Sequence, residues 1–250
     1  MATTATITTI ATADIMNEQY RFSRLALLRL QSWLSPAFPS GAYSYSHALE
    51  WAVEAGYIDD YKTLIDWLEA HLRYGSGRNE AIFFIAAWRS AAHNDRAKLF
   101  EIAELAGAFR GTSEFSLESS QQGVGCLSTL RRVWPDDLLD RLSEFLSEQH
   151  VPPALAVVHG VASAKEGIPA NLALAAFLQS YVANLVTAGV RLIPLGQTDG
   201  QRAIAALEQA VLAATEEGLA ATIDDLGSAG FMVDLASMQH ETQYTRLFRS

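Results

Sequence analysis

Apolar residues recur at helical spacing along almost the whole chain, and this pattern constrains the fold more than any other sequence feature. One clear stripe consists of Tyr61, Leu64, Ile65, Leu68 and Leu72. Positions three, four, seven and eleven apart share one face of an α-helix. No run of alternating apolar and polar residues is convincing as a strand. We therefore predict an all-α fold, a helical bundle of about ten helices.

The 250-residue chain has no serine-rich or glycine-rich linker and no visible repeat of about 20 to 50 residues. We therefore predict a single helical domain over residues 23–238. Residues 1–22 are rich in threonine and alanine but lack the charged and apolar regions of a secretory signal, so we expect a disordered N-terminal arm. Residues 239–250 are predicted to form a C-terminal tail.

An uncharged stretch between Gly167 and Arg191 is long enough to cross a membrane. It is rich in alanine and contains Asn171 and Gln179, which makes it weakly hydrophobic for insertion. We expect a buried core helix here and no membrane partner. The single cysteine, Cys126, cannot form an internal disulfide, which favours a reducing, cytoplasmic compartment.

The charge balance and the motifs argue against several functional classes. A formal charge of −10 gives no overall field that would attract nucleic acid. The sequence lacks the P-loop pattern of nucleotide hydrolases. Its six histidines are scattered, with no H-E-x-x-H and no C-x-x-C pattern. We therefore expect no tightly bound metal and no nucleotide.

The segment SPAFPSGAYSYSHALE, residues 35–50, mixes serine, histidine and glutamate and so raises the possibility of a helical hydrolase. Ser44 or Ser46 would then be the nucleophile and His47 the base. However, adjacent residues on a helix point in different directions, and the G-x-S-x-G elbow of one large hydrolase class is absent. The enzyme interpretation is the alternative to a recognition surface.

A helix beginning near Tyr43 would place Tyr43, His47 and Glu50 on one polar, aromatic face, while Leu49 turns toward the core. Tyrosine is enriched at interface hot spots, so this face could recognise another protein. The alternative is a solvated face with a weak pair between His47 and Glu50. The residues alone support both interpretations equally.

The chain ends in HETQYTRLFRS, where Tyr244, Leu247 and Phe248 are spaced as on one helical face and arginines lie beside them. Chain ends are usually frayed and polar, so aromatic residues here suggest a segment that docks into a groove on a partner. Packing of the tail back onto its own domain is nearly as well supported.

The segment from residue 115 to residue 133 carries Phe115, Glu118 and Gln122 along one line, with Gly123 and Gly125 in the middle of the pattern. A glycine inside a helix costs up to about 1 kcal/mol relative to alanine. Two together indicate that another backbone comes close. The same small-residue face is compatible with close helix packing in a dimer.

Four segments together resemble the UreF family of urease accessory proteins. They are SPAFPSGAYSYSHALE, EFSLESSQQGVG from residue 114, VRLIPLGQTDGQR from residue 190 and HETQYTRLFRS at the end. The resemblance implies an all-α, non-enzymatic adaptor chaperone that forms a homodimer. It would bridge a urease-binding accessory protein of the D or H type and a nickel-carrying GTPase of the G type for GTP-dependent nickel insertion into apo-urease. Nickel and GTP would be handled by these partners.

The resemblance also implies protein-binding residues in three of the segments. They are Tyr43, Tyr45, His47 and Glu50 in the first, Arg191, Gln197, Asp199 and Arg202 in the third, and Tyr244, Arg246, Leu247, Phe248 and Arg249 in the tail. The chain departs from the family pattern at Ala48, where a glycine is expected. Because alanine has the higher helix propensity, we expect its methyl group to favour a helix there.

Overall fold

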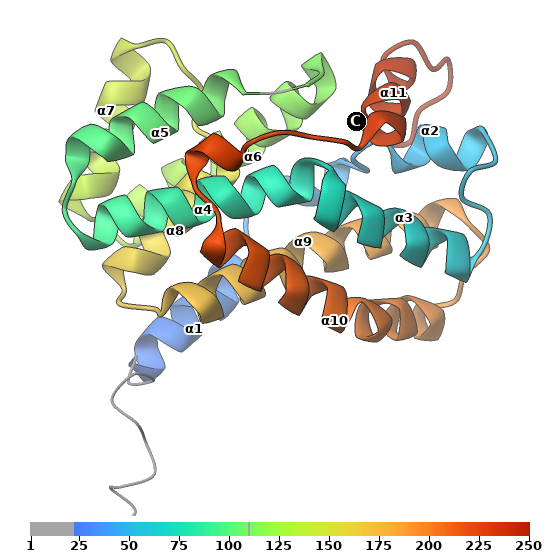
Figure 1. Cartoon of the computed structure of the whole chain (residues 1–250), viewed down its shortest axis with the longest axis horizontal. Coiled ribbons are helices and arrows are strands. Elements are labelled where there is room, and N and C mark those ends of the chain that lie inside the picture. Colours follow the sequence, from blue (N-terminus) through green and yellow to red (C-terminus); the bar gives the residue numbers. More distant parts are fainter. Residues whose placement is uncertain (1–22, 110) are drawn as a thin grey trace, which may run out of the picture.

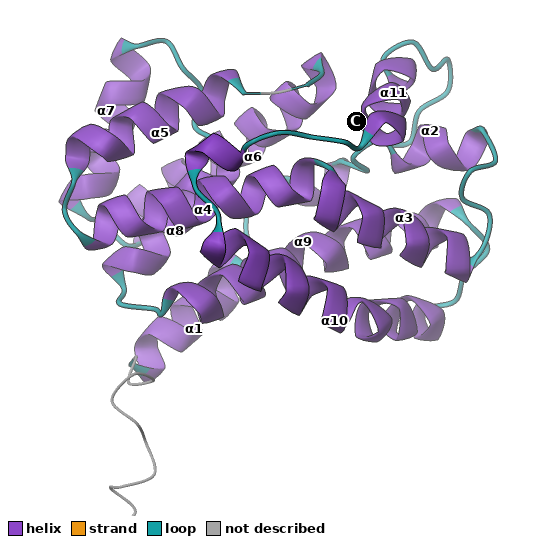
Figure 2. Cartoon of the chain, viewed as in Figure 1, coloured by secondary structure: helices purple, strands orange, loops and turns teal. Residues whose placement is uncertain are grey.

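The computed structural model of the chain describes residues 23–109 and 111–250, so the predicted arm over residues 1–22 lies outside the described residues. This part of the chain folds into helices, with no strand, which confirms the all-α prediction (Figure 2). The helices are α1 (Arg24–Trp33), α2 (Leu49–Glu54), α3 (Tyr61–Tyr74), α4 (Ser76–Ala92), α5 (Arg96–Ala108), α6 (Ser113–Val133), α7 (Asp137–Glu148), α8 (Leu155–Lys165), α9 (Ala170–Leu192), α10 (Gln197–Ala220) and α11 (Phe231–His240). Two 3-10 turns lie at Ala42–Ser44 and Ile223–Asp225.

Helix α4 lies at the centre of the fold, where it packs against α3, α5, α8, α9 and α10 (Figure 1). Ten of its 17 residues are buried, so it is covered on more than one face. Its closest neighbour is α8, because Gly160 has no side chain: a Cβ atom there would lie 2.4 Å from the carbonyl oxygen of Phe84. The contact between α4 and α8 therefore connects two groups of helices. One group consists of α5, α6, α7 and α8, and the other consists of α3, α9 and α10.

Helix α9 contains the uncharged stretch, and by length and composition it could cross a membrane. Half of its most apolar 18-residue window is buried inside the protein. The helix packs against α2, α3, α4, α8 and α10. These contacts agree with the core helix that the sequence predicts.

Carboxylate side chains accept hydrogen bonds at the starts of two helices. Helix α7 begins at Asp137, and the side chain of Asp136 accepts a hydrogen bond from the N–H of Leu138. Helix α10 begins at Gln197, and the Asp199 carboxylate accepts from the N–H of Gly196.

The two glycines of α6 allow close backbone packing, as predicted. A Cβ atom on Gly123 would lie 2.0 Å from the carbonyl oxygen of Pro153, and one on Gly125 would lie 2.8 Å from that of Pro39. Both neighbours belong to the same chain. The small-residue face is therefore filled within one molecule and is not free for a second copy.

The helix predicted to begin near Tyr43 is wrong. A 3-10 turn covers Ala42–Ser44, and α2 begins only at Leu49. Between them His47 and Ala48 adopt positive φ angles of 55° and 66°. A side chain is strained in this left-handed region, where glycine is favoured. The methyl group of Ala48 therefore does not favour a helix here, and the family's glycine fits the backbone better.

Candidate functional site

Three buried glutamates hold the C-terminal tail against the domain, and we call Glu50, Glu114 and Glu118 the tail anchor. Glu50 belongs to α2, and its two carboxylate oxygens accept hydrogen bonds from the backbone N–H groups of Leu247, at 2.5 Å, and Phe248, at 2.8 Å. Because a carboxylate accepts strongly, these bonds fix the tail backbone.

One histidine and one arginine face the glutamates of the tail anchor. The imidazole of His240 lies between two carboxylates, with Nδ1 at 2.8 Å from Glu114 and Nε2 at 3.3 Å from Glu50. Arg246 donates to Glu114 at 2.9 Å. Burial raises the pKa of Glu114, and His240 and Arg246 act in the opposite direction. The ion pair between Arg246 and the buried Glu114 carboxylate is costly to break, because the carboxylate would remain buried without its partner.

The last residue of the sequence, Ser250, is bonded to the first sequence segment. The Ser46 N–H donates to its carbonyl oxygen at 2.8 Å, and the Ser46 hydroxyl donates to the same oxygen at 2.5 Å. The Ser250 hydroxyl donates to Glu118 at 2.6 Å, and the Arg249 N–H donates to the carbonyl oxygen of Ser44 at 2.9 Å. The tail backbone thus packs on its own domain.

Arg191, from the third sequence segment, contacts both the first segment and the tail. Its guanidinium carbon lies 4.9 Å from the centre of the Tyr43 ring and 4.3 Å from that of the buried Phe248 ring. It also donates to the carbonyl oxygen of Tyr43 at 3.2 Å. Cation–π contacts of this kind contribute about 0.5–1 kcal/mol at exposed sites. We call the exposed residues Tyr43, Arg191, Tyr244, Leu247 and Arg249 the C-terminal surface.

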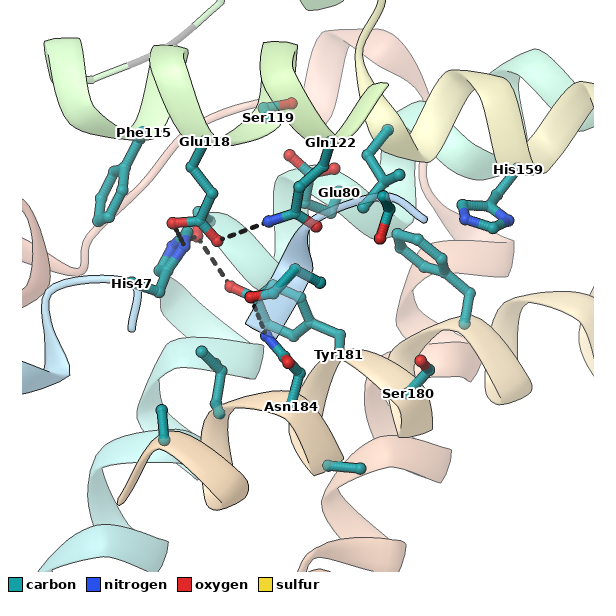
Figure 3. A pocket seen from close by; sticks show the side chains of 18 of the residues that line it. His47, Glu80, Phe115, Glu118, Ser119, Gln122, His159, Ser180, Tyr181 and Asn184 are labelled. Carbon is teal, nitrogen blue, oxygen red and sulfur yellow. Dashed lines mark hydrogen bonds and ion pairs between the residues drawn. The ribbon is translucent and has the colours of Figure 1, made fainter. Parts of the chain in front are cut away.

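Beneath the tail anchor lies a cavity of about 570 Å³, bordered by α4, α6, α8, α9 and the segment after α1 (Figure 3). Its lining includes the apolar side chains of Trp33 and Phe177. It also includes Gln122, whose amide donates to Glu118 at 3.2 Å, and Asn184, whose amide donates to the carbonyl oxygen of Ala42. The cavity is large enough for a small molecule or several waters.

His47 lies in the wall of this cavity rather than on the surface. Its Nδ1 is 3.1 Å from a carboxylate oxygen of Glu118, and its Nε2 is 2.7 Å from the Ser76 hydroxyl. Its ring stacks on Phe115 with centroids 4.0 Å apart. His71 lies behind it, 3.0 Å from the same hydroxyl, and burial lowers its pKa well below the usual value, with the nearby His47 a smaller cause.

The serines of the hydrolase interpretation do not pair with His47. Among the described residues, the Ser46 hydroxyl bonds Ser250, and the hydroxyl that faces His47 is that of Ser76. Sequence reasoning missed Ser76 because it lies 29 residues from His47, and Glu118 because it lies 71 residues away. No local spacing signals contacts of that separation.

The predicted protein-binding residues fall into three groups by exposure. Exposed are Tyr43, Arg191, Gln197, Arg202, Tyr244, Arg246, Leu247 and Arg249; Asp199 is half-buried; Tyr45, His47, Glu50 and Phe248 are buried. The predicted polar surface stripe is therefore wrong for His47 and Glu50, which face the interior.

The predicted binding residues of the third segment lie in two separate parts of the structure. Arg191 joins the C-terminal surface, whereas Gln197, Asp199 and Arg202 lie in the first two turns of α10. There Arg202 pairs with Asp199 at 3.0 Å, and its carbonyl oxygen accepts from the Tyr61 hydroxyl. Helix α11 includes Gln239 and His240, which are the first two residues of the predicted tail.

The fold and the site define an all-α protein whose C-terminal segment is built into its own domain and presents exposed aromatic and basic side chains. Comparison with known proteins supplies the family. The UreF family profile matches residues 58–208. The chain belongs to the UreF family of urease accessory proteins, as the four segments indicate.

Several curated relatives align over nearly the whole chain. The urease accessory protein UreF of Rhodopseudomonas palustris strain BisB5 is 46% identical over 250 residues, which cover all of both chains. That of Bradyrhizobium diazoefficiens is 48% identical over 90% of this chain and 92% of its own. That of Granulibacter bethesdensis is 48% identical over 90% of this chain and 94% of its own.

Proposed function

We propose that this protein is a non-enzymatic adaptor chaperone of urease maturation. It bridges a urease-binding accessory protein of the D or H type and a nickel-carrying GTPase of the G type, so that nickel enters apo-urease in a GTP-dependent step. It acts in the cytoplasm as a homodimer, and its partners handle GTP and carry the nickel. Full-length similarity to urease accessory proteins is the observation that carries this proposal.

The C-terminal surface supports a docking role. The tail anchor fixes the backbone of Leu247 and Phe248, yet the Leu247 side chain is 58% exposed and Tyr244 is fully exposed. A segment held in one conformation before binding loses less entropy when a partner docks. Tyrosine and arginine beside it are the residue types enriched at interface hot spots.

A bridging protein needs a second surface. Gln197 and Arg202 are exposed at the start of α10, and their segment contacts α3 rather than the tail. We assign the C-terminal surface to the urease-binding accessory protein and this α10 surface to the GTPase.

The test is co-elution of the purified chain with the urease-binding accessory protein in size-exclusion chromatography. The double variant Tyr244→Ala, Leu247→Ala removes apolar surface that is exposed in the free chain, so its helical content should stay unchanged while co-elution is lost. Leu212→Ala in α10 is the matched control, because Leu212 is similarly exposed. If the folded wild-type chain does not co-elute, the adaptor proposal fails.

Deleting residues 243–250 is a poorer test than these point substitutions. It would leave the buried carboxylates of Glu50, Glu114 and Glu118 without several of their hydrogen-bond donors. Unpaired buried charges are strongly destabilising. Loss of binding after the deletion would therefore combine partial unfolding with loss of the docking surface.

The hydrolase alternative now depends on Ser76 instead of Ser44 or Ser46. Ser76, His47 and Glu118 are connected in the order of nucleophile, base and orienting carboxylate. Labelling of the wild-type chain by a fluorophosphonate probe, lost in Ser76→Ala, would favour an enzyme. The adaptor proposal predicts no labelling and retention of partner binding in Ser76→Ala.

A further inference from the structure

A second, smaller pocket of about 170 Å³ lies between α1, the end of α6, the start of α7 and the end of α8, and we call it the α1 pocket. Its polar and charged lining consists of Arg29 and Trp33 from α1, Asp136 at the start of α7, and Lys165 and Glu166 at the end of α8. Trp33 also borders the larger cavity. The α1 pocket has room for a small organic molecule, since one water needs only about 10–15 Å³ of such space.

Two buried N–H groups at the α1 pocket have no hydrogen-bond partner in the described part of the chain. They belong to Nε of Arg29 and Nε1 of Trp33. Trp33 is a core residue with only 3% of its surface exposed. Both nitrogens are donors that do not accept, and a buried donor without an acceptor is destabilising. The α1 pocket therefore presents two N–H groups that favour an oxygen acceptor from outside the chain.

The fold fixes the positions of both donors. Arg29 and Trp33 are four residues apart in α1, so their side chains lie on the same face of the helix. The Nη1 atom of Arg29 donates to Glu166, which orients the guanidinium plane. The Trp33 ring meets the Trp134 ring edge to face, with centroids 5.9 Å apart. Because the donors are held in place before binding, less entropy is lost when a ligand arrives.

The charges at the α1 pocket select the kind of acceptor. Two cationic side chains, Arg29 and Lys165, are balanced by two carboxylates, Asp136 and Glu166. Arg29 pairs directly with Glu166, whereas Nζ of Lys165 lies 3.7 Å from Asp136. The two unpartnered N–H groups disfavour a metal cation, because they carry partial positive charge and no lone pair. A carboxylate has two oxygens that accept strongly from such groups. A doubly charged phosphate would place more negative charge beside Asp136 and Glu166.

The rest of the lining is apolar and consists of Leu130, Val133, Trp134, Pro135, Leu139 and Ala162. We propose that the α1 pocket binds a small organic monocarboxylate. Its oxygens accept hydrogen bonds from Nε of Arg29 and Nε1 of Trp33, and its short apolar part packs against the apolar lining. None of these residues belongs to the tail anchor, the C-terminal surface or the α10 surface, so the site adds a binding function beyond the adaptor role.

The test is a titration of the isotope-labelled full-length chain with sodium propionate at constant ionic strength, followed by NMR. The Nε1–H signal of Trp33, assigned by its loss in Trp33→Phe, should shift and reach saturation. We expect millimolar affinity, because a ligand of so few atoms makes few contacts. Propionamide has nearly the same shape but no charge, and it should bind at least about tenfold more weakly.

Three substitutions separate recognition of the carboxylate from packing of the pocket. Arg29→Met keeps a long side chain but has no donor, so propionate should bind at least about tenfold more weakly. Glu166→Gln breaks the same ion pair but keeps Nε of Arg29, so binding should be retained or strengthened. Arg24→Met, at an exposed arginine of the same helix, should bind as the wild type does. Circular dichroism should show that each variant is folded.

Four results would overturn the site. They are no saturable shift of the Trp33 signal, equal shifts of all five tryptophan signals, equal affinity for propionamide, and unchanged affinity in folded Arg29→Met. If Arg29→Met does not fold, the comparison of propionate with propionamide in the wild type decides the question. Failure of the chain to co-elute with its partner would contradict the adaptor proposal but would leave this site standing.

Discussion

The two halves of α6 bury their residues by opposite means. The first half, with Glu114, Glu118 and Gln122, packs against the tail and the cavity through charged and polar hydrogen bonds. The second half, beginning with Gly123, packs through close backbone contact and apolar side chains such as Leu130. One continuous helix thus supplies a polar anchor and a close-packed apolar interface. The first half is held mainly by hydrogen bonds to charged groups and the second mainly by complementary shape.

The largest effect should come from adding one methyl group to the apolar half. In Gly123→Ala the new Cβ atom would lie 2.0 Å from the carbonyl oxygen of Pro153, so the backbone must move. Overpacking of this kind should cost about 3 kcal/mol in the free energy of unfolding, measured by urea denaturation. Gly227→Ala is the control, because no atom lies within 4 Å of the corresponding position. Equal stability of both variants would contradict the close packing.

Acid should also lower the stability of the packing between His159 and the second half of α6. Burial lowers the pKa of His159, which contacts Cys126 of α6, to about 4 from 6.5. Between these two values the unfolded chain binds a proton that the folded chain does not, so stability falls as the pH falls. The His159 contribution should be about 3 kcal/mol between pH 7 and pH 4.

The measurement is urea unfolding of the wild type and His159→Gln at both pH values. The wild type should lose more stability than the variant, and equal losses would refute the assignment to His159.

For Glu114 in the polar half, the pH dependence of stability has the opposite sign. Its folded pKa is raised, so the folded chain binds the proton first and the Glu114 contribution to stability increases as the pH falls through that pKa.

The tail anchor should respond to removal of a charge without change of shape. Glu50→Gln replaces one acceptor of the Leu247 and Phe248 N–H bonds by an amide nitrogen, which should cost about 2 kcal/mol. Hydrogen exchange at these two amides should accelerate more than at α4. Glu101→Gln, in an exposed pair with Lys98, should change stability by less than about 0.5 kcal/mol. Unchanged exchange at both tail amides would show that Glu50 does not hold the tail.

The smallest effect should follow from removing a methyl group at Ala48. Ala48→Gly relieves the strain of a positive φ angle by about 1 kcal/mol. It also removes a buried methyl group, which costs about 0.8 kcal/mol. The two terms nearly cancel, so we expect a change in unfolding free energy of less than about 1 kcal/mol by thermal denaturation. A loss as large as that of Gly123→Ala would mean that packing dominates at both positions.

The sequence predicts the apolar half of α6 better than the polar half. Helical spacing gives α3 and α6, the uncharged stretch gives α9, and the glycines at 123 and 125 correctly indicate a close backbone. Both signals are local, because each depends on residues within a few turns. The identity of the approaching segments, around Pro39 and Pro153, is not local and was not predicted.

The surroundings of His47 and Glu50 could not be predicted in the same way. Their burial depends on Glu118, Ser76 and Phe248, which lie 29 to 198 residues away in the sequence. In addition, the prediction of a helix at Tyr43 assumed ordinary helical angles, whereas His47 and Ala48 adopt the left-handed region. Family resemblance identified these segments by their sequence, but it did not show which of their side chains face inward.

The bond between Ser46 and Ser250 joins residues 204 positions apart, and this has a consequence for synthesis of the protein. A chain emerging from the ribosome can form α3 and α4 early, but residues 44–50 lack their hydrogen-bond partners in the tail until residues 243–250 have also emerged. Contacts of such sequence separation form late and slowly. Until then three acidic side chains lack their tail partners, so each newly made chain passes through an interval in which a molecular chaperone or a protease can distinguish it from the finished protein.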